Sequence, residues 1–328
     1  MKLQYAEQLE FSSLKGGEFD IVICASGYES RATNLAKNIK TKGFKAAIGF
    51  AEHKFHPTRI INDTCFKDLG YREYIAHGSA YQQLIDILDD IINDYDEANT
   101  TRMLFQETVR ILVDYSCMTK VWYSTILNYF LNRYSEISTL ELTFSYSPSI
   151  FTNPQPPMPN KYMGPIPGIY RVSTSNKPTA LVIGLGYEKE TAKGIVEYLD
   201  PEKTFAFYSK PALDPKYESV IENNNSKLIT YLGKESVFKH PLMDLKTTDV
   251  LLSSLCLRLR KGYRIILAPL GPKPFALMCL FLATRYPDID VWRVSSGESG
   301  NIYDRAPAPV DPIICKAVFV GHQVEQPV

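Results

Sequence analysis

The feature that most constrains the fold of this chain is that its sequence repeats itself. Near the beginning, the apolar residues 21–23 lead into Gly27-Tyr28-Glu29, a helical stretch and a second apolar segment. The same order recurs about 159 residues later, where residues 181–183 lead into Gly186-Tyr187-Glu188. Self-similarity at a fixed spacing is the signature of a repeated structural unit. The sequence therefore predicts two copies of one fold.

A second match lies further along each half and keeps the order of the first. Residues 110–114 form an apolar run that leads into an apolar helix ending at Arg133-Tyr134. In the later half, residues 263–269 lead through Gly271-Pro272-Lys273-Pro274 into an apolar helix ending at Arg285-Tyr286. Two matches in the same order favour an internal duplication over chance.

The alternation of strands and helices predicts the fold class. Strands separated by helices indicate a mainly parallel sheet with helices on both faces, and apolar residues at consecutive positions, as in 265–268, suit a strand covered on both sides. Residues 148–172 are rich in proline, which disrupts helices and central strands, and they predict a linker. We expect an α/β protein of two tandem Rossmann-like units, at residues 1–147 and 173–328.

Composition excludes several classes of protein. The 36 basic and 36 acidic residues give a formal net charge of zero, which argues against a protein that coats nucleic acid or an anionic membrane. The six cysteines form no CxxC pair and predict free thiols in a reducing compartment. No apolar run approaches the ~18 residues of a membrane span. We expect a cytoplasmic protein.

Ligands of doubly wound sheets bind beyond the carboxyl ends of the strands. The first turn of each half lies there, because it follows a strand, and a glycine in it lets the backbone approach a phosphate at the helix N-terminus. The plain alternative is a tight turn with Glu29 and Glu188 facing a helix dipole. Neither turn carries the GxGxxG fingerprint, which disfavours an NAD enzyme. The candidate ligand-binding residues are Ser26, Gly27, Tyr28, Gly186 and Tyr187.

The later loops supply further candidates for ligand binding. A lysine in such a loop can reach a phosphate or carboxylate, and both halves have one, although Ser116 and Thr119 have the alternative role of helix caps. Ser295 and Ser296 follow a strand and either rim the site or form a polar loop. The candidates from these loops are Ser116, Thr119, Lys120, Gly271, Lys273, Ser295 and Ser296.

The strand, the short Gly/Ser/Thr-x-Lys-Pro loop and the apolar helix resemble the ligand loop of CARF domains, the Rossmann-like sensors of CRISPR-linked cyclic oligonucleotides. Two fused copies in one chain resemble the SAVED domains of bacterial antiphage systems, although the first half lacks the Gly-x-Lys-Pro form. The resemblance implies a nucleotide bound in a cleft between the two units, and a sensor or partner subunit of a defence or signalling system. It maps ligand contacts to Ser26, Gly27, Ser116, Thr119, Gly271 and Lys273.

The charged residues of the first half support a different class of function. Glu29, Arg31 and Asp114 are expected at adjacent strand ends, where two carboxylates and a guanidinium can act on a nucleotide or sugar phosphate. This predicts a hydrolase or a glycosyl- or phosphoribosyl-type transferase with these three as catalytic residues. The plain alternative is a salt bridge at the edge of the sheet.

A third hypothesis is a non-catalytic scaffold subunit whose repeat preserves only the fold. His53-x-x-His56 has no further ligands at metal-binding spacing and predicts an exposed loop, so neither a metal nor a cofactor is expected. The expected partners are a nucleotide or other phosphorylated small molecule, and a protein chain that carries an effector activity.

Overall fold

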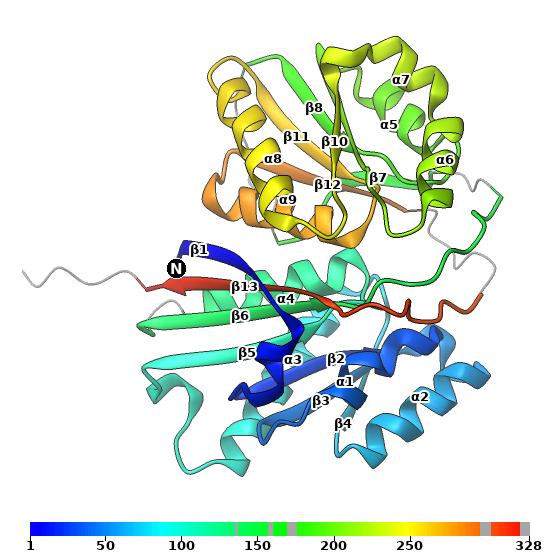
Figure 1. Cartoon of the computed structure of the whole chain (residues 1–328). Helices are drawn as coiled ribbons and strands as arrows, with labels where there is room; N and C mark the ends of the chain where they lie inside the picture. Colours follow the sequence, from blue (N-terminus) through cyan, green and yellow to red (C-terminus); the bar gives the residue numbers. More distant parts are fainter. Residues whose placement is uncertain (135–136, 157–159, 169–175, 296–302, 322–328) are drawn as a thin grey trace, which may run out of the picture. The chain divides into compact units, whose positions relative to one another are not determined.

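The computed structural model divides the chain into two compact units (Figure 1). Unit 1 comprises Met1–Ile150 and Tyr303–Val328, and unit 2 comprises Phe151–Ile302. The structure describes residues 1–134, 137–156, 160–168, 176–295 and 303–321.

Unit 1 is built on a seven-stranded sheet of order β1-β13-β6-β5-β2-β3-β4, in which β6 to β4 are parallel and the β13 and β1 pairings are antiparallel. Its strands are β1 (Lys2–Leu9), β2 (Ile21–Ser26), β3 (Phe44–Phe50), β4 (Arg72–Ala76), β5 (Thr108–Asp114), β6 (Thr139–Tyr146) and β13 (Ile313–Val320). Its helices are α1 (Asn34–Asn38), α2 (Pro57–Asp68), α3 (Tyr81–Ala98) and α4 (Lys120–Arg133), with short 3-10 turns at η1 (Phe11–Gly16), η2 (Ser30–Thr33), η3 (Ala51–His53) and η4 (Met103–Phe105).

Unit 2 is built on a six-stranded sheet of order β10-β9-β8-β11-β12-β7, in which only β7 is antiparallel to its neighbour. Its strands are β7 (Tyr162–Pro165), β8 (Thr179–Gly184), β9 (Lys203–Ser209), β10 (Val237–His240), β11 (Arg264–Pro269) and β12 (Ile289–Ser295). Its helices are α5 (Thr191–Leu199), α6 (Pro215–Asn224), α7 (Ser226–Leu232), α8 (Leu245–Leu259) and α9 (Lys273–Arg285), with a 3-10 turn at η5 (Lys234–Ser236).

The two sheets share one topology. The five parallel strands of unit 1 run in the order β4-β3-β2-β5-β6, and those of unit 2 run in the equivalent order β10-β9-β8-β11-β12. In each unit the strand before the Gly-Tyr-Glu turn (β2 or β8) lies at the centre of this five-strand set. The predicted fold class, two tandem Rossmann-like α/β units related by duplication, is therefore confirmed.

The C-terminal part of the chain differs from the sequence prediction, which assigned all of residues 173–328 to the second unit. Strand β13 pairs with β6 over eight residues and with β1 on its other side, so it belongs to the sheet of unit 1 (Figure 1). Its pairing satisfies the backbone groups that β6 would otherwise leave at a sheet edge. The predicted linker also differs in part, since β7 lies within residues 148–172 and pairs with β12.

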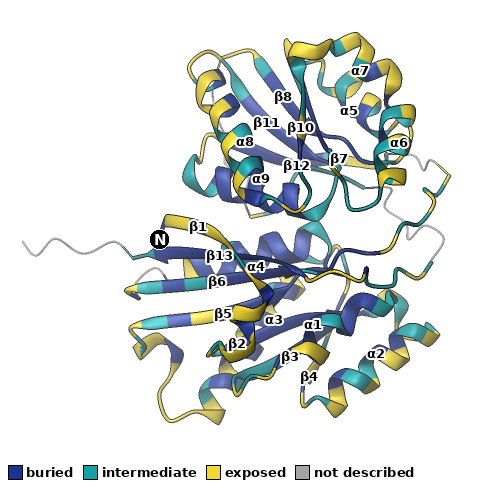
Figure 2. Ribbon diagram, in the orientation of Figure 1, coloured by how far each residue is buried: buried dark blue, intermediate teal, exposed yellow. Residues whose placement is uncertain are grey.

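Burial explains why these segments form these elements. All six residues of β2 are buried, as a central strand covered on both faces requires (Figure 2). The buried residues of α3 recur at helical spacing, from Leu84 through Leu88 to Ile91, and face the sheet. In α9 every residue from Pro274 to Ala283 is buried. Each fully buried large apolar side chain stabilises the fold by about 1.5–3 kcal/mol.

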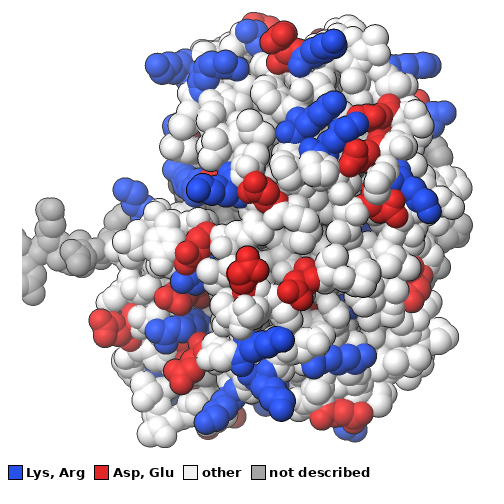
Figure 3. Space-filling view, viewed as in Figure 1, with Lys and Arg blue, Asp and Glu red and all other residues white. Residues whose placement is uncertain are grey.

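Two further properties bear on the class of protein. Among the described residues, no helix has the length and apolarity that crossing a membrane requires. On the face drawn in Figure 3, basic and acidic side chains are interspersed rather than gathered by sign. This agrees with the zero formal net charge of the sequence.

Candidate functional site

The candidate site lies at the carboxyl edge of the sheet of unit 1. Strand β2 has β3 on one side and β5 on the other. The chain therefore adds β3 and β4 on one side of β2 and then crosses to add β5 and β6 on the other side. Ligands of open α/β sheets bind at such a switch point, in the crevice between the two loops. In unit 1 these loops are residues 27–33, after β2, and residues 115–119, after β5.

An ion pair between Glu29 and Arg31 forms the centre of this edge. The Arg31 Nε lies 2.6 Å from Glu29 Oε2, and the two side chains are 2% and 12% exposed. Arg31 also donates through Nη1 to the carbonyl of Ser147, at 3.0 Å. Burial opposes the charge of Arg31, but Tyr146 and Glu29 outweigh it and hold the guanidinium pKa above its usual value. Arg31 is therefore charged throughout the physiological pH range.

Asp114, the last residue of β5, is buried. It is 2% exposed, and its Oδ1 accepts hydrogen bonds from the amide and the hydroxyl of Ser116 at 3.0 and 2.5 Å. The Ser116 hydroxyl in turn accepts from the Ser147 amide at 2.7 Å. Asp114 is thus connected to Arg31 through Ser116 and Ser147, whereas Glu29 and Arg31 form a direct ion pair.

The helix-cap alternative holds for one residue of this loop. Thr119 is the N-cap of α4, where its hydroxyl accepts from the Trp122 amide at 3.2 Å and donates to the Gly78 carbonyl at 2.7 Å. Ser116 does not cap the helix, because its hydroxyl is engaged by Asp114 and Ser147. Lys120 begins α4 directly after the cap.

Ser26 belongs to a buried network that the sequence did not reveal. Its hydroxyl donates to Asp63 at 2.5 Å and accepts from Arg59 at 3.1 Å. Arg59 is completely buried, pairs with Asp63 at 2.7 Å and donates to the Phe50 carbonyl at 2.6 Å. Its guanidinium fills the space beside Gly49, where a Cβ would lie 1.8 Å from Nη2. Ser26 therefore has a structural role in holding the end of β2.

The backbone of the Gly-Tyr-Glu turn is held by an asparagine of α2. Asn62 is 2% exposed and donates to the carbonyls of Gly27 and Glu29, each at 2.9 Å. A Cβ on Gly27 would meet Cys117 at 3.5 Å, which is ordinary contact. Packing therefore does not require glycine at this position.

An aromatic cluster lies beside the turn. The ring of Tyr28 is 4.7 Å from that of His53, edge-on, and 5.9 Å from that of His56. Burial raises the pKa of Tyr28 to about 12, and the charge of Glu29 adds to this shift. Burial also lowers the pKa of His53. The prediction of an exposed loop holds for Lys54 and Phe55, whereas His53 and His56 are partly buried beside Tyr28.

The segment that precedes β13 also contributes to the site. Arg305 lies 3.8 Å from the second carboxylate oxygen of Glu29, and Asp304 accepts from the Ser30 amide at 2.6 Å. The thiol of Cys117 donates to Glu29 at 3.5 Å. The sequence did not place Arg305 here, because it assigned the C-terminal segment to the other unit.

In unit 2 the two equivalent loops pack against each other through backbone atoms. A Cβ on Gly186 would lie 2.9 Å from the Leu270 carbonyl oxygen, and one on Gly271 would lie 2.8 Å from that of Leu185. The Gly186 carbonyl accepts from Asn225 at 3.0 Å, as that of Gly27 does from Asn62. Both glycines therefore allow two loops to approach closely.

The remaining candidates of unit 2 are spread along the same edge. The ring of Tyr187 packs 5.7 Å from that of Tyr217. Lys273 is the first residue of α9, as Lys120 is of α4. Ser295 ends β12, where it pairs with Tyr162, and Ser296 lies outside the described residues.

Comparison of the sequence with protein-family models and with curated proteins finds no match. Within the described parts of the chain, no three His, Cys, Asp or Glu residues gather as a set that could hold a metal ion. The fold and the site define a tandem Rossmann-like α/β protein with a buried ion pair at the switch point of unit 1.

Proposed function

We propose that unit 1 binds a nucleotide or another phosphorylated small molecule at the carboxyl ends of β2 and β5. The observation that carries the proposal is the buried ion pair of Glu29 and Arg31 at the switch point, with Arg305 beside it. Burying charge is costly, and proteins concentrate such groups at functional sites. At the positions of Glu29 and Arg31 the corresponding turn of unit 2 has Glu188 and Glu190, two acidic residues that are both exposed.

The chemistry of the side chains supports this class of ligand. Arg305 is 28% exposed, and a guanidinium binds phosphate through two parallel hydrogen bonds. The Glu29 carboxylate, which is 12% exposed, accepts from hydroxyl groups such as those of a ribose. The Tyr28 ring offers an aromatic surface for a base.

The resemblance to CARF and SAVED domains extends this proposal to a role. It makes the protein a cytoplasmic sensor or partner subunit of a bacterial defence or signalling system, with a cyclic oligonucleotide as one form of the ligand. On that basis the effector activity belongs either to a partner chain or to this chain itself.

A calorimetric titration of the full chain with AMP, cyclic AMP and a cyclic oligonucleotide tests the proposal. Saturable binding of at least one of them is expected, and Arg305→Ala weakens it about tenfold or more, because a charge-assisted bond to phosphate is lost. Arg110→Ala is the matched control: Arg110 lies on β5 of the same unit and pairs with Glu141, away from the carboxyl end. Binding that is equally strong in Arg305→Ala and the unsubstituted protein would overturn the proposal.

A second candidate function is hydrolysis or group transfer at the same site. It is favoured by the position of Glu29, whose carboxylate is partly exposed while Asp114 is enclosed. Glu29 is then the base that takes a proton from an attacking water, and Arg31 keeps it oriented. Chromatography of nucleotide incubated with the protein distinguishes the two functions. Turnover that is lost in Glu29→Gln, with binding retained, indicates the enzyme, and binding without turnover indicates the sensor.

A further inference from the structure

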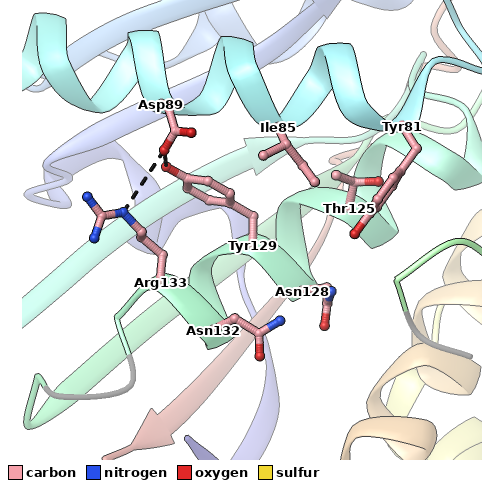
Figure 4. A pocket seen from close by; sticks show the side chains of 8 residues that line it. All are labelled: Tyr81, Ile85, Asp89, Thr125, Asn128, Tyr129, Asn132 and Arg133. Atoms are coloured by element: carbon pink, nitrogen blue, oxygen red, sulfur yellow. Dashed lines mark hydrogen bonds and ion pairs between the residues drawn. The ribbon is translucent and has the colours of Figure 1, made fainter. Parts of the chain in front are cut away.

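A second cavity lies in unit 1 between helices α3 and α4. It has a volume of about 540 Å³, within the range of small-molecule sites. Its lining shares no residue with the switch-point site described above. Figure 4 shows side chains of both helices around it: Tyr81, Ile85 and Asp89 from α3, and Thr125, Asn128, Tyr129, Asn132 and Arg133 from α4.

The lining contains a buried hydroxyl group that the protein itself does not satisfy. Thr125 is 1% exposed, and its Oγ1 has no hydrogen-bond partner among the residues that the structure describes. A buried hydroxyl without a partner costs stability, whereas its apolar isostere does not. The neighbouring Ser124 avoids this cost by donating to the Val121 carbonyl. Thr125 therefore has an unused donor and acceptor within the lining of the cavity.

The charges around the cavity offset one another. The hydroxyl of Tyr129 donates to Asp89 at 2.6 Å, and the Arg133 Nε lies 4.0 Å from the same carboxylate (Figure 4). Burial raises the pKa of Tyr129 above its usual value, so this phenol stays neutral. One acid and one base remain, which gives no net charge. The lining therefore suits an uncharged ligand, in contrast to the switch-point site.

We infer that this cavity binds an uncharged compound with a hydroxylated sugar ring, of the nucleoside class. The Asn128 and Asn132 amides each donate and accept, and with Thr125 they match the hydroxyls of a sugar. The tyrosine rings supply flat apolar surface for a base or for the C–H face of the sugar. The volume accommodates a sugar together with a base. A nucleoside and a free sugar share this chemistry, and the choice of probes separates them.

The experiment is an NMR titration of the full chain with adenosine, uridine, ribose and adenine. The titration is done on the Arg305→Ala variant, in which binding at the switch-point site is already weakened. The shifts then report on the second cavity, whether or not the switch-point site binds nucleotide. Saturable shifts with a nucleoside are expected, weaker with ribose or adenine alone. Thr125→Val and Asn128→Leu each weaken the nucleoside roughly tenfold, whereas Gln82→Ala, an exposed neighbour of Tyr81 outside the lining, leaves it unchanged.

The melting temperature separates a ligand site from a structural role. Thr125→Val removes the unsatisfied hydroxyl with little change of shape, so the melting temperature stays the same or rises while nucleoside binding weakens. Absence of saturable shifts with every probe would overturn the inference. So would nucleoside binding that Thr125→Val and Asn128→Leu leave intact.

Discussion

The turn after β2 and the turn after β8 contain the same three residues but differ in structure. In both, a buried asparagine donates to the glycine carbonyl: Asn62 in unit 1 and Asn225 in unit 2. At β8 the glycine then packs against the Leu270 carbonyl. At β2 the turn instead holds the buried Arg31 and its ion pair with Glu29. The duplication has kept the scaffold of the turn, while the arginine that pairs with its glutamate is present in unit 1 and replaced by Glu190 in unit 2.

The strand register sharpens this comparison. Cys24 of β2 pairs with Asp114, and Ile183, which corresponds to Cys24, pairs with Ala268. The two apolar runs of the sequence end at Asp114 and Pro269, so the strand pairing shifts the equivalence by one residue, to Asp114 and Ala268. Because Ala268 carries no carboxylate, unit 2 lacks the buried link from the strand end to the ion pair. Unit 1 is therefore the copy in which a strand-end carboxylate, Asp114, accompanies the ion pair of Glu29 and Arg31.

The largest expected effect comes from removing the buried charge of unit 1. Arg31→Ala leaves Glu29 without its closest partner and is expected to lower the free energy of unfolding by about 3 kcal/mol. Lys189→Ala at the exposed turn of unit 2 is expected to change it by less than about 0.5 kcal/mol. Urea denaturation measures both. Equal losses would show that the two turns do not differ in buried charge.

The equivalent strands β10 and β4 are expected to differ by a similar amount in how the stability of the fold depends on pH. Burial lowers the pKa of His240, at the end of β10, from 6.5 to about 4. Its unfolded state therefore binds more protons over this range, so stability falls as the pH drops from 6.5 toward 4, by up to about 3 kcal/mol. Strand β4 ends in Ala76, which does not titrate.

His240→Phe is the variant that isolates this effect. The imidazole already stacks on Phe275, so phenylalanine fits the same surroundings. Urea denaturation between pH 4 and 7 should give a flatter profile for this variant. A slope that is as steep as in the unsubstituted protein would assign the pH dependence to other groups.

The shared scaffold predicts matched losses in the two units. Asn62→Ala and Asn225→Ala each leave a buried carbonyl of the Gly-Tyr-Glu turn without its donor, and each is expected to cost about 1–3 kcal/mol. Thermal denaturation of the two variants measures this. A loss confined to Asn62→Ala would show that the asparagine of unit 2 does not have the same role.

The glycines predict a smaller contrast. Gly271→Ala brings a Cβ to 2.8 Å from the Leu185 carbonyl oxygen and is expected to lower stability by about 1–3 kcal/mol. Gly27→Ala makes only ordinary contacts and is expected to change stability by less than about 0.5 kcal/mol. The melting temperatures of both variants check this pair. A large loss of stability in Gly27→Ala would mean that packing requires this glycine too.

The sequence predicted those features that depend on neighbouring residues. The repeat and the consecutive apolar runs indicated two parallel sheets, and Glu29 with Arg31 were expected together because they share one turn. Their link to Asp114 was not predictable, since it passes through Ser147 of a different segment. Neither was the approach of Arg305, because nothing in an apolar strand such as β13 indicates which of two sheets it joins.

We propose that the turn after β2, and not the turn after β8, binds the ligand. Hydrogen exchange of the full chain, with and without a nucleotide that binds in the titration, tests it most directly. We predict that the ligand slows exchange of the backbone amides of residues 27–31 and 303–305 and leaves residues 186–189 unchanged. Protection at residues 186–189 without protection at residues 27–31 would contradict the account.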